Sequence, residues 1–322
     1  MTRFFKAFLR DRLEGRVHAA VFGKHPAWDD HIDDIGLVTE SLALAKRLLY
    51  LEGIAGQLAS GAWDRIESSG QGVEFDHRFV WGRDGQAIIG AIWASSDGKG
   101  RARFPMVICI QAGLAGCAAI GPYLAPVERL GMLCKSATRQ EAVREFHSRL
   151  SSDLNIQAPS RSSAAEPFSM DKPDRAPNAI LEALIGLASG LKRSVTRNFG
   201  EGGHSAHFRV PAVCSPGERN LKFWSGYLER RANLHNLHLP YLVIARENAP
   251  SIDLIIGEPE SKDFFCLRAN ETVLPVLDEH STPAEAAKFE VDAKEYLQSW
   301  GIVFDTPPRK SSWLANLFDK RS

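Results

Sequence analysis

Ala87-Ile88-Ile89-Gly90-Ala91-Ile92-Trp93-Ala94 is a short run of apolar and β-branched residues, a composition typical of a buried strand. Similar runs lie before and after it, at Arg78–Trp81 and Phe104–Gln111. Asp-Gly pairs at residues 84–85 and 97–98 separate the three runs, and this dipeptide favours tight hairpin turns. The pattern therefore predicts three consecutive antiparallel strands.

The segments on either side of these strands complete a first α/β unit. An apolar strand is predicted at His18–Phe22, followed by the turn-forming Gly23-Lys24-His25-Pro26. Apolar residues at helical spacing predict a long helix over Val38–Leu58, and two more helices are expected at Pro122–Cys134 and Arg139–Leu154. The expected architecture is an antiparallel sheet flanked by helices, an α+β-like arrangement of the α/β class.

A smaller second α/β unit is predicted after the first, which covers residues 17–156. Residues 157–178 are rich in Ser, Pro, Ala and Asp with little apolar periodicity, as is typical of a flexible linker. Helices and strands then alternate over 179–304. The expected helices are Ala179–Leu191, Glu218–Asn233 and Pro283–Trp300, and the expected strands are Ala206–Val210, Tyr241–Ala245, Ile252–Ile256 and Phe264–Arg268.

The composition is that of a globular cytosolic protein with a substantial core. Of the 322 residues 44% are hydrophobic, and 39 basic residues balance 39 acidic ones. This balance argues against a nucleic-acid partner, since no overall positive field attracts phosphates. The five cysteines include no Cys-x-x-Cys pair and stand mostly in apolar runs, which predicts reduced core residues.

The two ends of the chain share a pattern of aromatic and apolar residues between cations. Residues 1–16 and 305–322 are predicted to form basic amphipathic segments, and the first is too charged for a signal peptide. No apolar run approaches the roughly 20 residues that span a bilayer. We expect a cytoplasmic protein whose end segments pack on their own domains. Contact with a partner or a membrane surface is the alternative.

The charged loop, Lys24-His25-Pro26-Ala27-Trp28-Asp29-Asp30-His31-Ile32-Asp33-Asp34, is the densest cluster of ionisable side chains in the chain. Trp28 stands where no hydrophobic period requires it, which is consistent either with an exposed interface anchor or with a lid that folds back over its own domain. We expect this loop to bind a partner, with exposed contacts at Lys24, His25, Trp28, Asp29 and His31. The alternative is a metal-dependent hydrolase that uses His25, Asp29, Asp30 and His31 as ligands.

Sequence motifs favour binding over catalysis. His25 and His31 lack the i, i+4 register of a helical zinc site. The chain contains no Gly-x-Ser-x-Gly nucleophile motif, no phosphate-binding Gly-x-x-x-x-Gly-Lys-Ser/Thr loop and no Gly-x-Gly-x-x-Gly after a strand. We therefore expect neither catalytic residues nor a cofactor.

Several short motifs resemble the TagF (ImpM) family of type VI secretion-associated proteins. Gly23-Lys24-His25-Pro26, followed by Asp29-Asp30-His31, is similar to the family's Gly-Lys-x-Pro-x-x-Gly-Asp-Phe pattern. Arg103-Phe104-Pro105-Met106 is similar to its Arg-x-Phe-Pro-Leu segment. Phe223-Trp224-Ser225-Gly226 and Leu239-Pro240-Tyr241-Leu242 resemble a Trp-x-x-Gly and Pro-x-Leu arrangement. Trp28-Asp29-Asp30-His31 departs from the family's Gly-Asp-Phe.

The resemblance implies a bacterial, cytoplasmic, non-enzymatic accessory protein. TagF proteins restrain type VI secretion after translation, by binding a forkhead-associated scaffold or other assembly components. The motif positions carried over are Gly23, Lys24, Pro26, Asp30, Phe104 and Pro105. We expect Gly23 and Pro26 to shape the turn, Asp30 to cap the following helix, and Phe104 to anchor the strands to that helix.

Overall fold

The computed structural model describes residues 13, 16–83, 85–156, 173–197, 205–215, 217–235, 239–277 and 283–304. Most of the expected basic end segment 1–16, all but the last residues of the expected linker 157–178, and the tail 305–322 lie outside these ranges. Within the described ranges, no helix combines the length and apolarity needed to cross a membrane.

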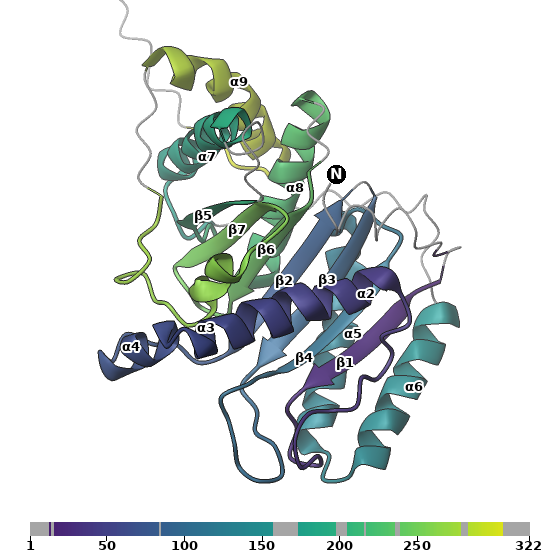
Figure 1. The fold of residues 1–322 in the computed structure, drawn as a ribbon. Coiled ribbons are helices and arrows are strands. Elements are labelled where there is room, and N and C mark those ends of the chain that lie inside the picture. The colour runs from purple at the N-terminus through teal and green to yellow at the C-terminus, as the bar shows by residue number, and fades with distance from the viewer. Residues whose placement is uncertain are drawn as a thin grey trace, which may run out of the picture.

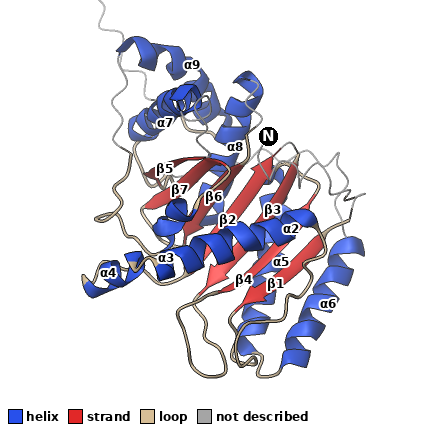
Figure 2. Ribbon diagram, viewed as in Figure 1, coloured by secondary structure: helices blue, strands red, loops and turns tan. Residues whose placement is uncertain are grey.

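The centre of the structure is a seven-stranded antiparallel sheet with the order β1-β4-β3-β2-β6-β7-β5 (Figure 2). The strands are β1 His18–Gly23, β2 Asp76–Arg83, β3 Gln86–Trp93, β4 Met106–Ala112, β5 Ser205–Pro211, β6 Tyr241–Arg246 and β7 Ser251–Gly257. Every neighbouring pair is antiparallel. The α/β class and the three consecutive strands predicted from the sequence are confirmed.

The sheet crosses the boundary expected between the two units. β2 pairs with β6, which places Phe79 opposite Ile244 and Trp81 opposite Leu242. Strands from the two predicted units therefore belong to one sheet. The pairing satisfies an edge of β2 that would otherwise expose unpaired backbone groups, and strand periodicity alone does not show which strand covers an edge.

Helices cover both faces of the sheet (Figure 1). One face carries α2 Glu40–Ala45, the π-helix η1 Lys46–Ile54, α3 Ala55–Ala59, α4 Ala62–Ser68 and the 3₁₀ helix η2 Ser261–Leu267. The other face carries α5 Gly116–Ser136, α6 Gln140–Ile156, α7 Pro177–Arg197, α8 Gly217–His235 and α9 Pro283–Ser299. The fold is thus a three-layer arrangement with the sheet in the middle.

Strand alternation divides the core between the two faces. In β2, Phe79 and Trp81 point to the face of α2, while Val80 between them points to the face of α5. The expectation for the cysteines is confirmed, because all five are free thiols, four of them buried and Cys117 partly buried.

Two helix predictions need correction in detail. The long helix expected at Val38–Leu58 is a continuous run from Glu40 to Ala59 whose central part is π-helical. Thr39 caps it, because its hydroxyl accepts a hydrogen bond from the backbone N–H of Leu42 at 3.2 Å. α5 begins at Gly116, so Pro122 lies inside the helix and does not start it.

Two further local predictions are wrong. The expected strand Phe264–Arg268 is replaced by η2, because the side chains of Glu260 and Asp263 form a reciprocal capping box that starts a helical turn. The pair Asp97-Gly98 does not form a tight hairpin. β3 and β4 are instead joined by a longer loop, residues 94–105.

We predict a single cooperative unfolding transition, since side chains from both halves of the chain share one core. Phe264 is fully buried against the same cluster as Trp63, whose indole N–H donates to the Phe265 carbonyl at 3.4 Å. Phe264→Ala should lower the free energy of unfolding by about 3–5 kcal/mol. Urea denaturation followed by tryptophan fluorescence measures this, and two separate transitions would contradict it.

Candidate functional site

Two loops meet at one end of the sheet, the charged loop after β1 and residues 94–105 between β3 and β4 (Figure 1). The backbone N–H of Lys24 donates to the Pro105 carbonyl at 3.0 Å, and that of Gly98 donates to the Trp28 carbonyl at 2.7 Å. Gly23 has a φ of +105°, and a Cβ there would lie 2.3 Å from the Pro105 oxygen. Only glycine fits this contact.

The turn itself forms as predicted. The backbone N–H of Trp28 donates to the His25 carbonyl at 3.0 Å and closes a turn around Pro26. The fixed φ of proline suits this place in the turn. The expected roles of Gly23 and Pro26 are therefore confirmed.

A buried ion-pair network ties the two loops together. Lys24 is only 4% exposed, and its ammonium donates to Asp30 Oδ1 and to Asp97 Oδ2, both at 2.6 Å. The Asp97 carboxylate also accepts from Arg101 Nε at 2.7 Å and from the backbone N–H groups of Lys99 and Arg101 at 3.0 Å. The expectation that Lys24 is an exposed contact is wrong, because the buried carboxylate holds it inside.

The network favours ionised carboxylates. Burial raises the pKa of Asp97, but the hydrogen bonds from Lys24 and Arg101 and from backbone N–H groups outweigh it and hold the pKa well below its usual range. The hydrogen bond from Lys24 likewise lowers the pKa of Asp30. Both groups are therefore charged at neutral pH and retain the Lys24 ammonium.

His25 is a structural residue. It is 1% exposed, its Nδ1 accepts from the Ala27 backbone N–H at 3.0 Å, and its Nε2 donates to the Cys134 carbonyl at 2.7 Å. Both ring nitrogens are occupied, so neither is free for a metal. In the described part of the chain, no group of three metal-ligand atoms forms at the charged loop. The structure does not assemble His25, Asp29, Asp30 and His31 into a metal centre, and His25 is not an exposed contact.

Trp28 is buried as well, with 4% of its surface exposed. Its ring packs edge to face on His25 with centroids 5.4 Å apart, and its indole N–H donates to Asp33 Oδ2 at 3.3 Å. Helix α6 closes over this part of the loop, where Arg144 lies above the indole ring at 5.9 Å. The expectation of an exposed anchor is wrong, because a helix distant in sequence covers the ring.

Asp29, Asp30 and His31 remain at the surface of the charged loop. The side chain of Asp30 is 66% exposed and that of His31 is 41% exposed. Asp30 binds Lys24 and Arg101 and does not cap the following helix, a role taken by Thr39. The expected capping role of Asp30 is therefore wrong.

An aromatic cluster supports His31 from below. The imidazole packs edge to face on Tyr50 and Phe104, with centroid distances of 5.7 Å and 5.5 Å. Phe104 in turn lies 5.5 Å from Tyr50, which belongs to the long helix. The expectation that Phe104 anchors the strands to this helix is confirmed.

Tyr50 is a site residue that sequence reasoning missed. It is 1% exposed, and its hydroxyl has no hydrogen-bond partner among the described residues. Burial, and then the negative charge of Asp30, raise the pKa of Tyr50, so the phenol stays protonated. Tyr50 also stands in the π-helix, a rare element that occurs frequently at functional sites. The apolar residues around Tyr50 have the spacing of an ordinary α-helix, so the sequence does not indicate the π-helix.

Comparisons with known proteins give little further information. No protein-family model matches this chain, and no curated protein matches it significantly. A crystal structure described as PA0076 from Pseudomonas aeruginosa PAO1 is similar over 82% of this chain and 97% of its own, with 13% identity and a TM-score of 0.35. A similarity at this level carries no conclusion about function.

We predict that Trp28→Ala destabilises the fold, because it leaves a cavity between the charged loop and α6. The free energy of unfolding should fall by about 3–5 kcal/mol. The exposed neighbour provides a control, since Asp29→Ala should change stability by less than about 0.5 kcal/mol. Urea denaturation of both variants measures the difference, and equal stabilities would contradict the buried position of Trp28.

We predict that the Asp97 network gives the protein an acid-sensitive step. The pKa of Asp97 is lower in the folded state than in the unfolded state, where it is about 3.9. The stability that the ionised carboxylate contributes is therefore complete above about pH 3.9 and is lost as the pH falls below that value. Asp97→Asn should be less stable at pH 7 and should show a shallower loss of Tm between pH 5 and pH 2.5. If Tm falls equally steeply with decreasing pH in the wild type and in Asp97→Asn, this role of Asp97 is contradicted.

Proposed function

We propose that this protein is a non-enzymatic accessory protein of a bacterial type VI secretion system that acts in the cytoplasm by binding another protein. One observation carries the proposal. The two segments that resemble TagF motifs, at Gly23-Lys24 and Phe104-Pro105, lie against each other through the Lys24–Pro105 hydrogen bond and the close approach of Gly23. Motifs far apart in the sequence thus pack together at one end of the sheet, where Gly23, Lys24 and Pro105 are buried and Phe104 is partly buried.

The TagF resemblance gives this proposal its direction. TagF proteins restrain assembly after translation by binding a forkhead-associated scaffold. We extend the same role to this chain, as a post-translational repressor whose partner is such a scaffold or another assembly component. The metal-dependent hydrolase is the less favoured alternative, because both ring nitrogens of His25 are already hydrogen-bonded.

The contact surface proposed here is the loop surface, which comprises Asp29, Asp30, His31 and Arg101. All four residues are exposed, and Asp29 makes no ion pair with the described residues, so its carboxylate is available to a cation of the partner. The charges at the edge of such a surface favour fast and selective association. The buried network beneath them fixes the loop before binding, which reduces the ordering cost.

We predict that the double variant Asp29→Ala, His31→Ala binds its partner at least about tenfold more weakly, which corresponds to about 1.4 kcal/mol. The partner is the forkhead-associated scaffold encoded with the secretion system of the source organism, purified and immobilised. Affinity is measured by surface plasmon resonance on full-length protein, and circular dichroism should show an unchanged fold.

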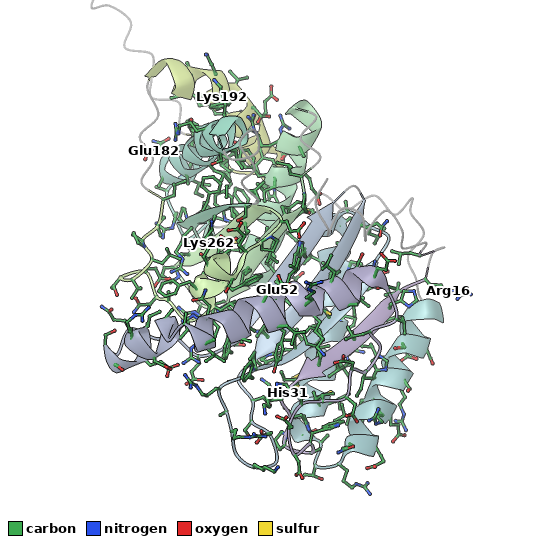
Figure 3. All side chains as sticks on the ribbon, viewed as in Figure 1. Arg16, His31, Glu52, Glu182, Lys192 and Lys262 are labelled. Carbon is green, nitrogen blue, oxygen red and sulfur yellow. The ribbon has the colours of Figure 1, made fainter. Side chains whose placement is uncertain are left out.

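Glu182→Ala is the matched control, since Glu182 is an exposed carboxylate on α7, away from the charged loop (Figure 3). It should leave the affinity unchanged. If the double variant binds as tightly as the wild type, the loop surface is not the contact. If no secretion-system protein binds the wild type at all, the proposed function itself is wrong.

A further inference from the structure

Three potential metal ligands meet near the β5 edge of the sheet, the edge opposite β1, on the face that η2 covers. His207 comes from β5, Asp253 from β7 and Cys266 from η2. One imidazole nitrogen, one carboxylate oxygen and the thiol sulfur all lie within 4.8 Å of one another. No other group of this kind forms among the residues that the structure describes.

We infer that His207 Nε2, Asp253 Oδ1 and Cys266 Sγ form a binding site for Zn²⁺. Nitrogen, oxygen and thiolate sulfur are the donors that zinc takes in proteins, at about 2.0–2.3 Å, which places neighbouring donors of a tetrahedral site about 3.5 Å apart. The three donors lie within 4.8 Å of one another, so binding requires that the His207 Nε2–Asp253 Oδ1 pair, now 2.9 Å apart, widens slightly and that the sulfur moves closer to both. The thiolate also selects zinc over magnesium or calcium, which prefer oxygen ligands.

Asp253 has room for the ion although it already binds an arginine. Arg209 Nε donates to Oδ1 and Arg209 Nη2 donates to Oδ2, both at 2.8 Å. The second lone pair of Oδ1 faces His207 Nε2 at 2.9 Å. Zinc takes the place of the proton between these two atoms, and the imidazole then carries its proton on Nδ1.

Arg209 has the properties of an outer residue that orients metal ligands. Besides the carboxylate of Asp253, its guanidinium donates to the backbone carbonyl of Cys266 at 3.3 Å and to that of Ala269 at 3.0 Å. It therefore holds the carboxylate ligand and the backbone of the thiol ligand in one geometry. Ligating carboxylates are commonly hydrogen-bonded in this way.

Proton and charge balance are consistent with one bound dication. Binding converts the Cys266 thiol to a thiolate and releases one proton. Because burial raises the pKa of this thiol, zinc affinity should rise with pH. Besides the three ligands, the titratable or charged groups that face the site are His77, Arg209, Arg246, Asp263 and Glu271.

These surrounding groups offset the added charge. Arg209 already neutralises Asp253, and burial lowers the pKa of His77 to about 3, so His77 is uncharged at neutral pH. The thiolate together with Asp263 and Glu271 then balances the zinc ion and Arg246.

A hollow that Asp253, Cys266, Arg246, Ser251 and Glu271 help to line provides the path of entry. Water from this hollow supplies the fourth ligand.

The test uses Co²⁺ as a spectroscopic probe for zinc. Metal-free full-length protein titrated with Co²⁺ should bind one equivalent and develop the near-ultraviolet charge-transfer absorption of a cobalt–thiolate bond. Zn²⁺ should abolish this absorption by displacement. Cys266→Ser should lose it, whereas Cys109→Ser, which removes another buried thiol of the same core cluster, should retain it.

Because Cys266→Ser alters a buried position, a second variant keeps the test decisive. His207→Gln should retain the thiolate absorption but bind Co²⁺ at least tenfold more weakly, with circular dichroism showing a folded chain. No charge-transfer absorption in the folded wild type would overturn the site and leave a hydrogen-bonded network only. Unchanged affinity in His207→Gln, or absorption that survives in Cys266→Ser, would overturn the three-ligand assignment.

Discussion

The buried ion pair between Lys24 and Asp97 is the interaction on which the exposed loop surface depends. An ammonium and a carboxylate inside a protein are stable only when each is paired and hydrogen-bonded. Here the Asp97 carboxylate accepts hydrogen bonds from the side chains of Lys24 and Arg101 and from two backbone N–H groups. The Lys24 ammonium also donates to Asp30. One carboxylate from the loop between β3 and β4 therefore fixes the loop that follows β1, and with it the positions of Asp29, Asp30 and His31.

The same end of the molecule combines a rigid base with accessible charges. His25 and Trp28 pack into the core on the side of α5 and α6, while Phe104 and Tyr50 support His31 on the side of the long helix. The loop is held from both faces of the sheet, which is the preorganisation that lowers the cost of binding. We propose this end as a contact surface because Asp29, Asp30 and His31 are exposed above a hydrogen-bonded base.

Much of the fold could be predicted from the sequence, because strand and helix periodicity is local. The runs around Ala87–Ala94, the turn at Gly23 and the long helix after Val38 appear as expected. Predictions failed where distant segments decide the outcome. Trp28 is covered by α6, Lys24 is drawn inward by Asp97, and β6 extends the sheet across the expected boundary. The residues next to these positions in the sequence do not indicate such distant partners. The spacing of apolar residues around Tyr50 likewise does not distinguish a π-helix from an α-helix.

A double-mutant cycle on Lys24 and Asp97 tests the central claim most directly. The free energies of unfolding are measured for the wild type, Lys24→Met, Asp97→Leu and the double variant. If the buried pair holds the two loops together, each single change removes one partner of a buried charge, and the double variant loses clearly less stability than the sum of the single losses. Additive losses would show that the two residues act independently, which would contradict the account.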